Sequence, residues 1–136
     1  MVTDGDGQMP RVLIVEDNEL NRDMLSRRLE RRGWTTLVAI DGQEGIDAAR
    51  QEQPDLILMD LSLPEVSGLD ATRIIRGMSE IGSVPIIALS AHAMLEDRAS
   101  ALAAGCDEFE TKPVNIDQLL MKMNLLSAEA LTNDRQ

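Results

Sequence analysis

The sequence predicts an α/β fold with a doubly wound parallel sheet of five strands and five helices. Three observations favour this class. Short apolar runs alternate with amphipathic stretches, the apolar runs are nearly continuous, and three of them end in an acidic or hydroxyl side chain. Continuous apolar strands are typical of a sheet that is covered on both faces. Regular alternation with helices indicates βαβ units and therefore parallel strands.

The five apolar runs are the expected strands. The fifth is weaker because acidic residues interrupt it. In chain order, the expected strands are residues 11–16, 34–39, 55–60, 84–90 and 106–111.

The stretches between the strands are expected to be helical. Residues 18–32, 42–53 and roughly 66–78 supply the first three helices. Apolar residues at helical spacing indicate a fourth helix around residues 95–103 and a fifth around residues 116–123. Gly33 and Gly105 follow two of these helices, at the position where a left-handed residue commonly ends a helix.

Length and composition indicate one soluble domain. The chain has 136 residues, enough for one core and too few for two. We expect the domain at residues 11–126, with flexible tails at residues 1–10 and 127–136. The single Cys106 excludes an internal disulfide and fits a reducing compartment. Without a signal peptide or an apolar run of about 20 residues, a cytoplasmic location away from any membrane is expected.

The charge balance argues against nucleic acid as a partner. The formal net charge is −11, and such a chain repels a phosphate backbone. No Gly-rich phosphate loop occurs, and the loop after the first strand begins with Glu16 and Asp17. That acidic loop disfavours a nucleotide or flavin phosphate and favours a cation.

Polar side chains stand where the expected strands end. Glu16 and Asp17 follow the first strand and Asp60 ends the third. Ser90 ends the fourth strand, and Lys112 follows the fifth. Ligands of doubly wound sheets bind outside the carboxyl ends of the strands. We therefore expect these five side chains to line one crevice.

Clustered carboxylates in this crevice favour a hard divalent cation, because unneutralised acids repel each other and their pKa values rise. Mg²⁺ or Mn²⁺ takes oxygen ligands. Asp17 and Asp60 are expected to bind the ion directly, Glu16 through water. An X-Pro bond can be cis, and a cis Lys112–Pro113 bond would aim the ammonium into the crevice. A cation, an ammonium and the Ser90 hydroxyl could together stabilise a phosphoryl group on a carboxylate.

Several short motifs occur in a fixed order along this framework. They are Val15-Glu16-Asp17-Asn18, Leu58-Met59-Asp60-Leu61-Ser62-Leu63-Pro64, Gly68, Leu89-Ser90-Ala91, Gly105-Cys106 and Phe109-Glu110-Thr111-Lys112-Pro113. Together they resemble the receiver domain of bacterial response regulators, the CheY-like superfamily, over about residues 11–126. The resemblance implies a flavodoxin-like sheet with strand order 2-1-3-4-5.

The resemblance also implies roles for the crevice residues. Asp60 corresponds to the phosphoacceptor, and Lys112 to the lysine that pairs with a phosphoryl oxygen. Glu16 and Asp17 correspond to the acidic pair that holds Mg²⁺, with the backbone carbonyl of Ser62 as a further ligand. Such a protein is no enzyme in the ordinary sense: it transfers a phosphoryl group to itself and loses it slowly.

Four positions bear on how such a domain switches and how long it stays phosphorylated. Ser90 and Phe109 correspond to the hydroxyl and aromatic residues of the family's switch. Phe109 replaces the more frequent tyrosine, so a phenol hydrogen bond is impossible here. Ser62 and His92 correspond to positions beside the path of the hydrolytic water, which makes them candidates for setting the phosphoryl lifetime.

The expected partners are a sensor histidine kinase, a histidine phosphotransfer protein, or both, with a downstream regulatory protein as a further possibility. The pattern Asp17, Asn18, Asn21 and Arg22 resembles receivers of phosphorelays and hybrid kinases, and stand-alone receivers that bind a kinase. The helix at residues 18–32 is the candidate surface for the histidine donor. The fourth and fifth helices with the fifth strand are the candidate surface for downstream partners.

Two other functions stay open at this point. A receiver-like module could bind a partner without being phosphorylated, although no acid, acceptor or lysine is lost. A Mg²⁺-dependent phosphatase of the haloacid dehalogenase type also uses an aspartate nucleophile. That family has a second acid two residues after the nucleophile, where this chain has Ser62.

Overall fold

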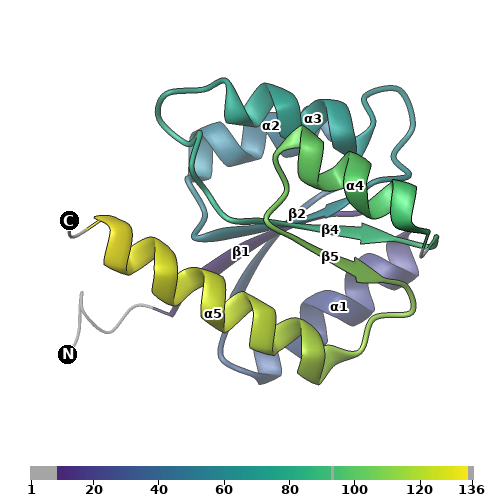
Figure 1. The fold of residues 1–136 in the computed structure, drawn as a ribbon. Helices are drawn as coiled ribbons and strands as arrows, with labels where there is room; N and C mark the ends of the chain where they lie inside the picture. The colour runs from purple at the N-terminus through teal and green to yellow at the C-terminus, as the bar shows by residue number, and fades with distance from the viewer. Residues whose placement is uncertain (1–8, 93, 135–136) are drawn as a thin grey trace.

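Figure 1 shows a central parallel sheet between two layers of helices, in a computed structural model that describes residues 9–92 and 94–134. The strand order is β2-β1-β3-β4-β5, and every neighbouring pair is parallel. The predicted fold class and strand order are therefore confirmed. The strands are β1 Arg11–Val15, β2 Thr35–Ala39, β3 Leu56–Asp60, β4 Ile86–Ser90 and β5 Glu108–Thr111.

In the part of the chain that the structure describes, five helices cover the two faces of the sheet. Helices α2, α3 and α4 lie on one face, and α1 and α5 lie on the other (Figure 1). Their bounds are α1 Glu19–Arg31, α2 Gly42–Glu52, α3 Gly68–Arg76, α4 Leu95–Ala104 and α5 Ile116–Asp134. In the described part of the chain, no helix is long and apolar enough to cross a membrane.

The sheet separates two apolar cores, which explains why its central strands are continuously apolar. In β1, Leu13 and Val15 pack against α2 and α3, whereas Val12 and Ile14 pack against α1 and α5. Side chains alternate across a strand, so a strand that is covered on both faces must be apolar at every position. All residues of β3 and β4 are buried.

Side-chain caps fix where two helices near the crevice begin. The Asn18 side chain accepts a hydrogen bond from the Asn21 N–H, 2.9 Å away, and so starts α1 directly after the acidic loop. Ser67 caps α3 in the same way through the Asp70 N–H. Because Ser67 is the cap, α3 begins at Gly68, two residues later than expected from the sequence.

The fifth helix differs most from the sequence-based expectation. It continues to Asp134, whereas the sequence predicted a flexible tail from residue 127. Residues 127–134 contain no glycine or proline, so nothing in the backbone interrupts the helix after Leu126. The other predicted tail, residues 1–10, lies outside the described residues up to position 8.

Candidate functional site

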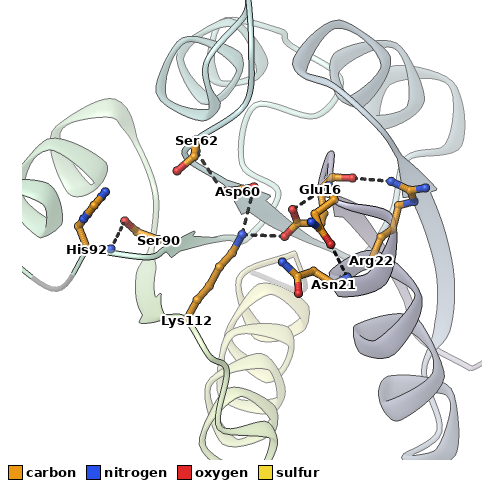
Figure 2. A network of polar contacts seen from close by, with 9 residues as sticks. Glu16, Asn21, Arg22, Asp60, Ser62, Ser90, His92 and Lys112 are labelled. Carbon is orange, nitrogen blue, oxygen red and sulfur yellow. Dashed lines mark hydrogen bonds and ion pairs between the residues drawn. The ribbon is translucent and has the colours of Figure 1, made fainter.

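The polar residues that end the strands meet at one edge of the sheet, as Figure 2 shows. Glu16 directly follows β1, Asp60 and Ser90 are the last residues of β3 and β4, and Lys112 follows β5. Parallel strands place their carboxyl ends at the same edge. The structure therefore brings together residues that lie up to 96 positions apart in the sequence.

Three carboxylates form the centre of this site. One oxygen each from Glu16, Asp17 and Asp60 lies within 4.8 Å of the others. Glu16 and Asp60 are each 1% exposed, whereas Asp17 is exposed to solvent. Three oxygen donors with one side open to water fit a hard divalent cation that keeps part of its water shell. The donor set is therefore compatible with Mg²⁺.

Lys112 connects two of these carboxylates. Its Nζ lies 2.8 Å from Glu16 Oε1 and 3.1 Å from Asp60 Oδ2, as Figure 2 shows. Burial lowers the pKa of Lys112, but the hydrogen bond to Glu16 and the charge of Asp60 outweigh it, so this pKa is raised overall. Lys112 is thus held as a cation between two buried anions. The Lys112–Pro113 peptide bond is cis.

Both carboxylate oxygens of Glu16 are held by partners. Its Oε1 accepts from Lys112, and its Oε2 accepts from the Asn18 N–H at 3.1 Å. Burial raises the pKa of Glu16, and the hydrogen bonds from Lys112 and Asn18 only partly offset that effect. Since both of its oxygens already have partners, Glu16 is less available to a cation than the exposed Asp17.

Asp60 sits in a backbone environment that the following loop completes. Its Oδ1 accepts a hydrogen bond from the Ser62 N–H at 3.0 Å, and its Oδ2 faces Lys112. Gly68 lies directly against this segment: a Cβ at position 68 would stand 2.2 Å from the Asp60 carbonyl oxygen. The start of α3 and the end of β3 therefore determine each other's position.

The hydroxyl and aromatic candidates lie beside the site without joining its ion pairs. Ser90 Oγ accepts a hydrogen bond from the His92 N–H at 3.1 Å. Phe109 is 5% exposed and belongs to the core on the α2–α4 face of the sheet. The Arg98 guanidinium lies 6.0 Å from the centre of its ring. The exposed His92 side chain is on the solvent side of this group.

Two contacts could not be read from residue spacing alone. Arg22 donates from its guanidinium to the carbonyl oxygen of Glu16 at 2.9 Å. The close approach of Gly68 to Asp60 is the other. Both residues belong to the quoted motifs, but only the fold reveals which atoms they contact. The nearest signal in the sequence is the Asn21-Arg22 pair that follows the acidic loop.

Replacing Asp17 with Asn is expected to abolish Mg²⁺ binding and to stabilise the metal-free protein by up to about 1 kcal/mol. Removing one of three neighbouring negative charges relieves repulsion, and an exposed charge is strongly screened by water. Calorimetric titration with Mg²⁺ checks the first effect, and thermal unfolding in chelator checks the second. A lower melting temperature in chelator would contradict the arrangement of acids described above.

Comparison with known proteins places the chain among signalling receivers. A family model described as the response regulator receiver domain matches residues 12–124. The polar-differentiation response regulator DivK of Brucella anthropi is 41% identical over 113 residues, which are 82% of this chain and 92% of that protein. DivK of Brucella ovis is 40% identical over 109 residues, or 80% and 89% of the two chains.

Solved structures agree with this family and with the nature of the site. The receiver domain of the sensor histidine kinase PA1611 from Pseudomonas aeruginosa is 33% identical, with a TM-score of 0.83 over 89% of this chain and 99% of that one. That structure has a magnesium ion coordinated in its active-site cleft. The chemotaxis protein CheY4 of Vibrio cholerae is 28% identical, with a TM-score of 0.82 over 88% and 99% of the two chains.

Proposed function

We propose that this chain, which belongs to the response regulator receiver domain family, accepts a phosphoryl group on Asp60 with the help of Mg²⁺. The position of Lys112 carries this proposal. Its ammonium is held between Glu16 and Asp60, next to an acidic cluster that fits a divalent cation. A carboxylate flanked by a fixed cation can take on a phosphoryl group because charge neutralisation and positioning dominate phosphoryl transfer.

In the proposed reaction, an oxygen of the Asp60 carboxylate forms a bond to the phosphorus of the donor. The bond between phosphorus and the donor atom breaks, and its electron pair leaves with the donor. Lys112 then exchanges its contact with Asp60 for one with a phosphoryl oxygen. Asp17, Asp60 and the Ser62 carbonyl would hold Mg²⁺, or Mn²⁺ in its place, with Glu16 acting through water. The bound cation would neutralise part of the phosphoryl charge.

The proposed switch involves Ser90 and the loop that follows β4. The Ser90 hydroxyl accepts a hydrogen bond from the His92 N–H, and its own O–H would donate to a phosphoryl oxygen and so draw this loop toward Asp60. Charge-assisted bonds from Ser90 and Lys112 are worth about 1.5–3 kcal/mol each. Reversing a 1:99 equilibrium takes about 5.5 kcal/mol. Both states should therefore stay populated after phosphorylation.

Phe109 is the second residue of the proposed switch. When Ser90 and the loop after β4 move toward the phosphoryl group, the Phe109 ring would fill the space that they leave. The ring is already buried in the core, so this movement would repack the core beside β4. Ser62 and His92 remain the candidates for tuning the phosphoryl lifetime, since they flank Asp60 and Ser90 and both are exposed.

The proposed phosphoryl donor is a histidine of a sensor kinase or of a phosphotransfer protein, and we propose that the exchange occurs in the cytoplasm. A groove that runs from the site along α1 supports this docking mode. Besides Glu16 and Lys112, the groove is lined by Met24, Arg28 and Ile116 among other residues. Apolar side chains beside the reactive carboxylate suit a partner helix that presents a histidine.

A downstream regulatory protein would bind a different surface in this proposal. Exposed large apolar residues occur on α4, on the residue that precedes it and on α5. Exposed apolar groups of this size often mark interaction sites. They are Met94, Leu95, Leu102, Met121 and Leu125.

The proposal is tested by incubating the chain with Mg²⁺ and acetyl phosphate and measuring its intact mass. We expect a gain of one phosphoryl group, which is lost in chelator and in the Asp60→Asn variant. If no group is added under any condition, a receiver that only binds partners becomes the better reading. Multiple turnover of a phosphomonoester would instead indicate a phosphatase. We do not expect this result, because Ser62 stands where such a phosphatase needs its second acid.

A further inference from the structure

We infer that Arg22 is a positioning residue for the cation site, because it fixes the peptide that joins Glu16 to Asp17. This inference rests on the proposed function, since the cation concerned is the proposed Mg²⁺. One guanidinium nitrogen of Arg22 donates to the Glu16 carbonyl oxygen at 2.9 Å. In Figure 2 the Arg22 side chain reaches this carbonyl on the side of the loop opposite Lys112 and Asp60.

The planarity of the peptide bond transmits this contact to Asp17. The Glu16 carbonyl and the Asp17 nitrogen belong to one rigid plane. The Glu16 N–H is already held by the Ala39 carbonyl of β2 at 3.0 Å. With the carbonyl held by Arg22 as well, both ends of the Glu16 backbone are fixed, and so is the direction in which Asp17 leaves the strand.

Asp17 depends on this support more than the other acids do. The Glu16 and Asp60 carboxylates have partners of their own in Lys112, Asn18 and Ser62. For the exposed Asp17 carboxylate, no hydrogen bond or ion pair is found among the described residues. Its position relative to Asp60 is therefore determined mainly by the backbone that Arg22 fixes.

The direction in which Mg²⁺ affinity changes when Arg22 is replaced separates a positioning role from an effect of its charge. A guanidinium near a cation site repels the cation, so removing its charge alone would strengthen Mg²⁺ binding. Losing the hydrogen bond that orients a ligand-bearing loop would weaken binding instead, and groups that support metal ligands are typically worth about tenfold or more in affinity. The two roles of Arg22 thus predict changes in opposite directions.

The test measures the Mg²⁺ dissociation constant of the full chain by calorimetric titration for wild type, Arg22→Met, Arg22→Lys and Arg31→Met. Arg31 is an exposed residue of the same helix and serves as the control for loss of one positive charge. We expect Arg22→Met to weaken binding about tenfold, Arg22→Lys to lie in between, and Arg31→Met to match wild type. Titrations are run well below the melting temperature, which the fluorescence of Trp34 reports in chelator.

Unchanged or tighter Mg²⁺ binding by Arg22→Met would overturn the inference while leaving the proposed function intact. If Arg22→Met does not fold, Arg22→Lys decides: binding equal to wild type would overturn the inference, and weaker binding supports it. If wild type itself binds no Mg²⁺, the proposed function fails together with the inference. A parallel change in affinity for Arg31→Met would assign the effect to net charge and would also overturn the positioning role.

Discussion

Replacing Lys112 with methionine is expected to lower the free energy of unfolding by about 3 kcal/mol in chelator. Glu16 and Asp60 are each 1% exposed and share this lysine as their cation. Removing one partner from a buried ion pair leaves an uncompensated buried charge, which costs far more than the pair contributes. Here two anions lose their partner at once. Urea unfolding followed by the fluorescence of the buried Trp34 measures the change.

Mg²⁺ should reverse most of this loss. Without the ammonium the site is more negative, so a divalent cation binds more tightly and stabilises the folded state by a larger amount. We therefore expect a greater increase in stability on adding Mg²⁺ for Lys112→Met than for wild type. An equal increase in both proteins would contradict the proposed placement of Lys112 and the cation around the same carboxylates. Arg31→Gln controls for the loss of one positive charge from an acidic protein.

The difference in free energy of unfolding between wild type and Lys112→Met should depend on pH, because the pKa of Lys112 is raised. A lysine whose pKa is higher in the folded state contributes its full stability at any pH below its pKa in the unfolded state. This contribution is lost as the pH rises through its pKa in the folded state. The gap between wild type and Lys112→Met should thus be constant from about pH 7 to about pH 9. The gap should shrink only above pH 10.5, the ordinary pKa of lysine.

Replacing Gly68 with alanine should both destabilise the fold and impair phosphorylation. The new Cβ would stand 2.2 Å from the Asp60 carbonyl oxygen and 2.8 Å from the Leu61 Cα. Both are backbone atoms, so no side chain can turn away, and either β3 or α3 must shift. Overpacking of this kind costs about 3 kcal/mol. Because the shift moves Asp60, we also expect the rate of phosphorylation by acetyl phosphate to fall about a hundredfold.

Gly77→Ala is the matched control for that substitution. Gly77 ends the same helix, with a φ of −81°, and a Cβ there would come no closer than 3.5 Å to another heavy atom. Its stability should stay within about 0.5 kcal/mol of wild type, with an unchanged phosphorylation rate. Unfolding and mass measurements on both variants check the contrast. If a folded Gly68→Ala protein were phosphorylated at the wild-type rate, Asp60 would be shown to tolerate displacement.

The sequence contained enough information for the fold because its central strands are buried on both faces. The runs at β1, β3 and β4 must be apolar at every position, and that pattern is visible without a structure. Boundaries were less predictable where a single contact decides them. Ser67 caps α3, so the helix starts two residues later than its apolar pattern suggests. Past Leu126, helical propensity continues α5 where a tail was expected.

For the site, the sequence by itself determined the residue types and the strand ends that carry them. Parallel strands put their carboxyl ends at one edge, so Glu16, Asp60, Ser90 and Lys112 had to meet once the strands were known. Only the tertiary structure decided which atoms pair. Lys112 bridges Glu16 and Asp60, and Arg22 holds the Glu16 carbonyl. Such contacts depend on side-chain rotamers and on packing between elements that are distant in the chain, and no local pattern in the sequence encodes either.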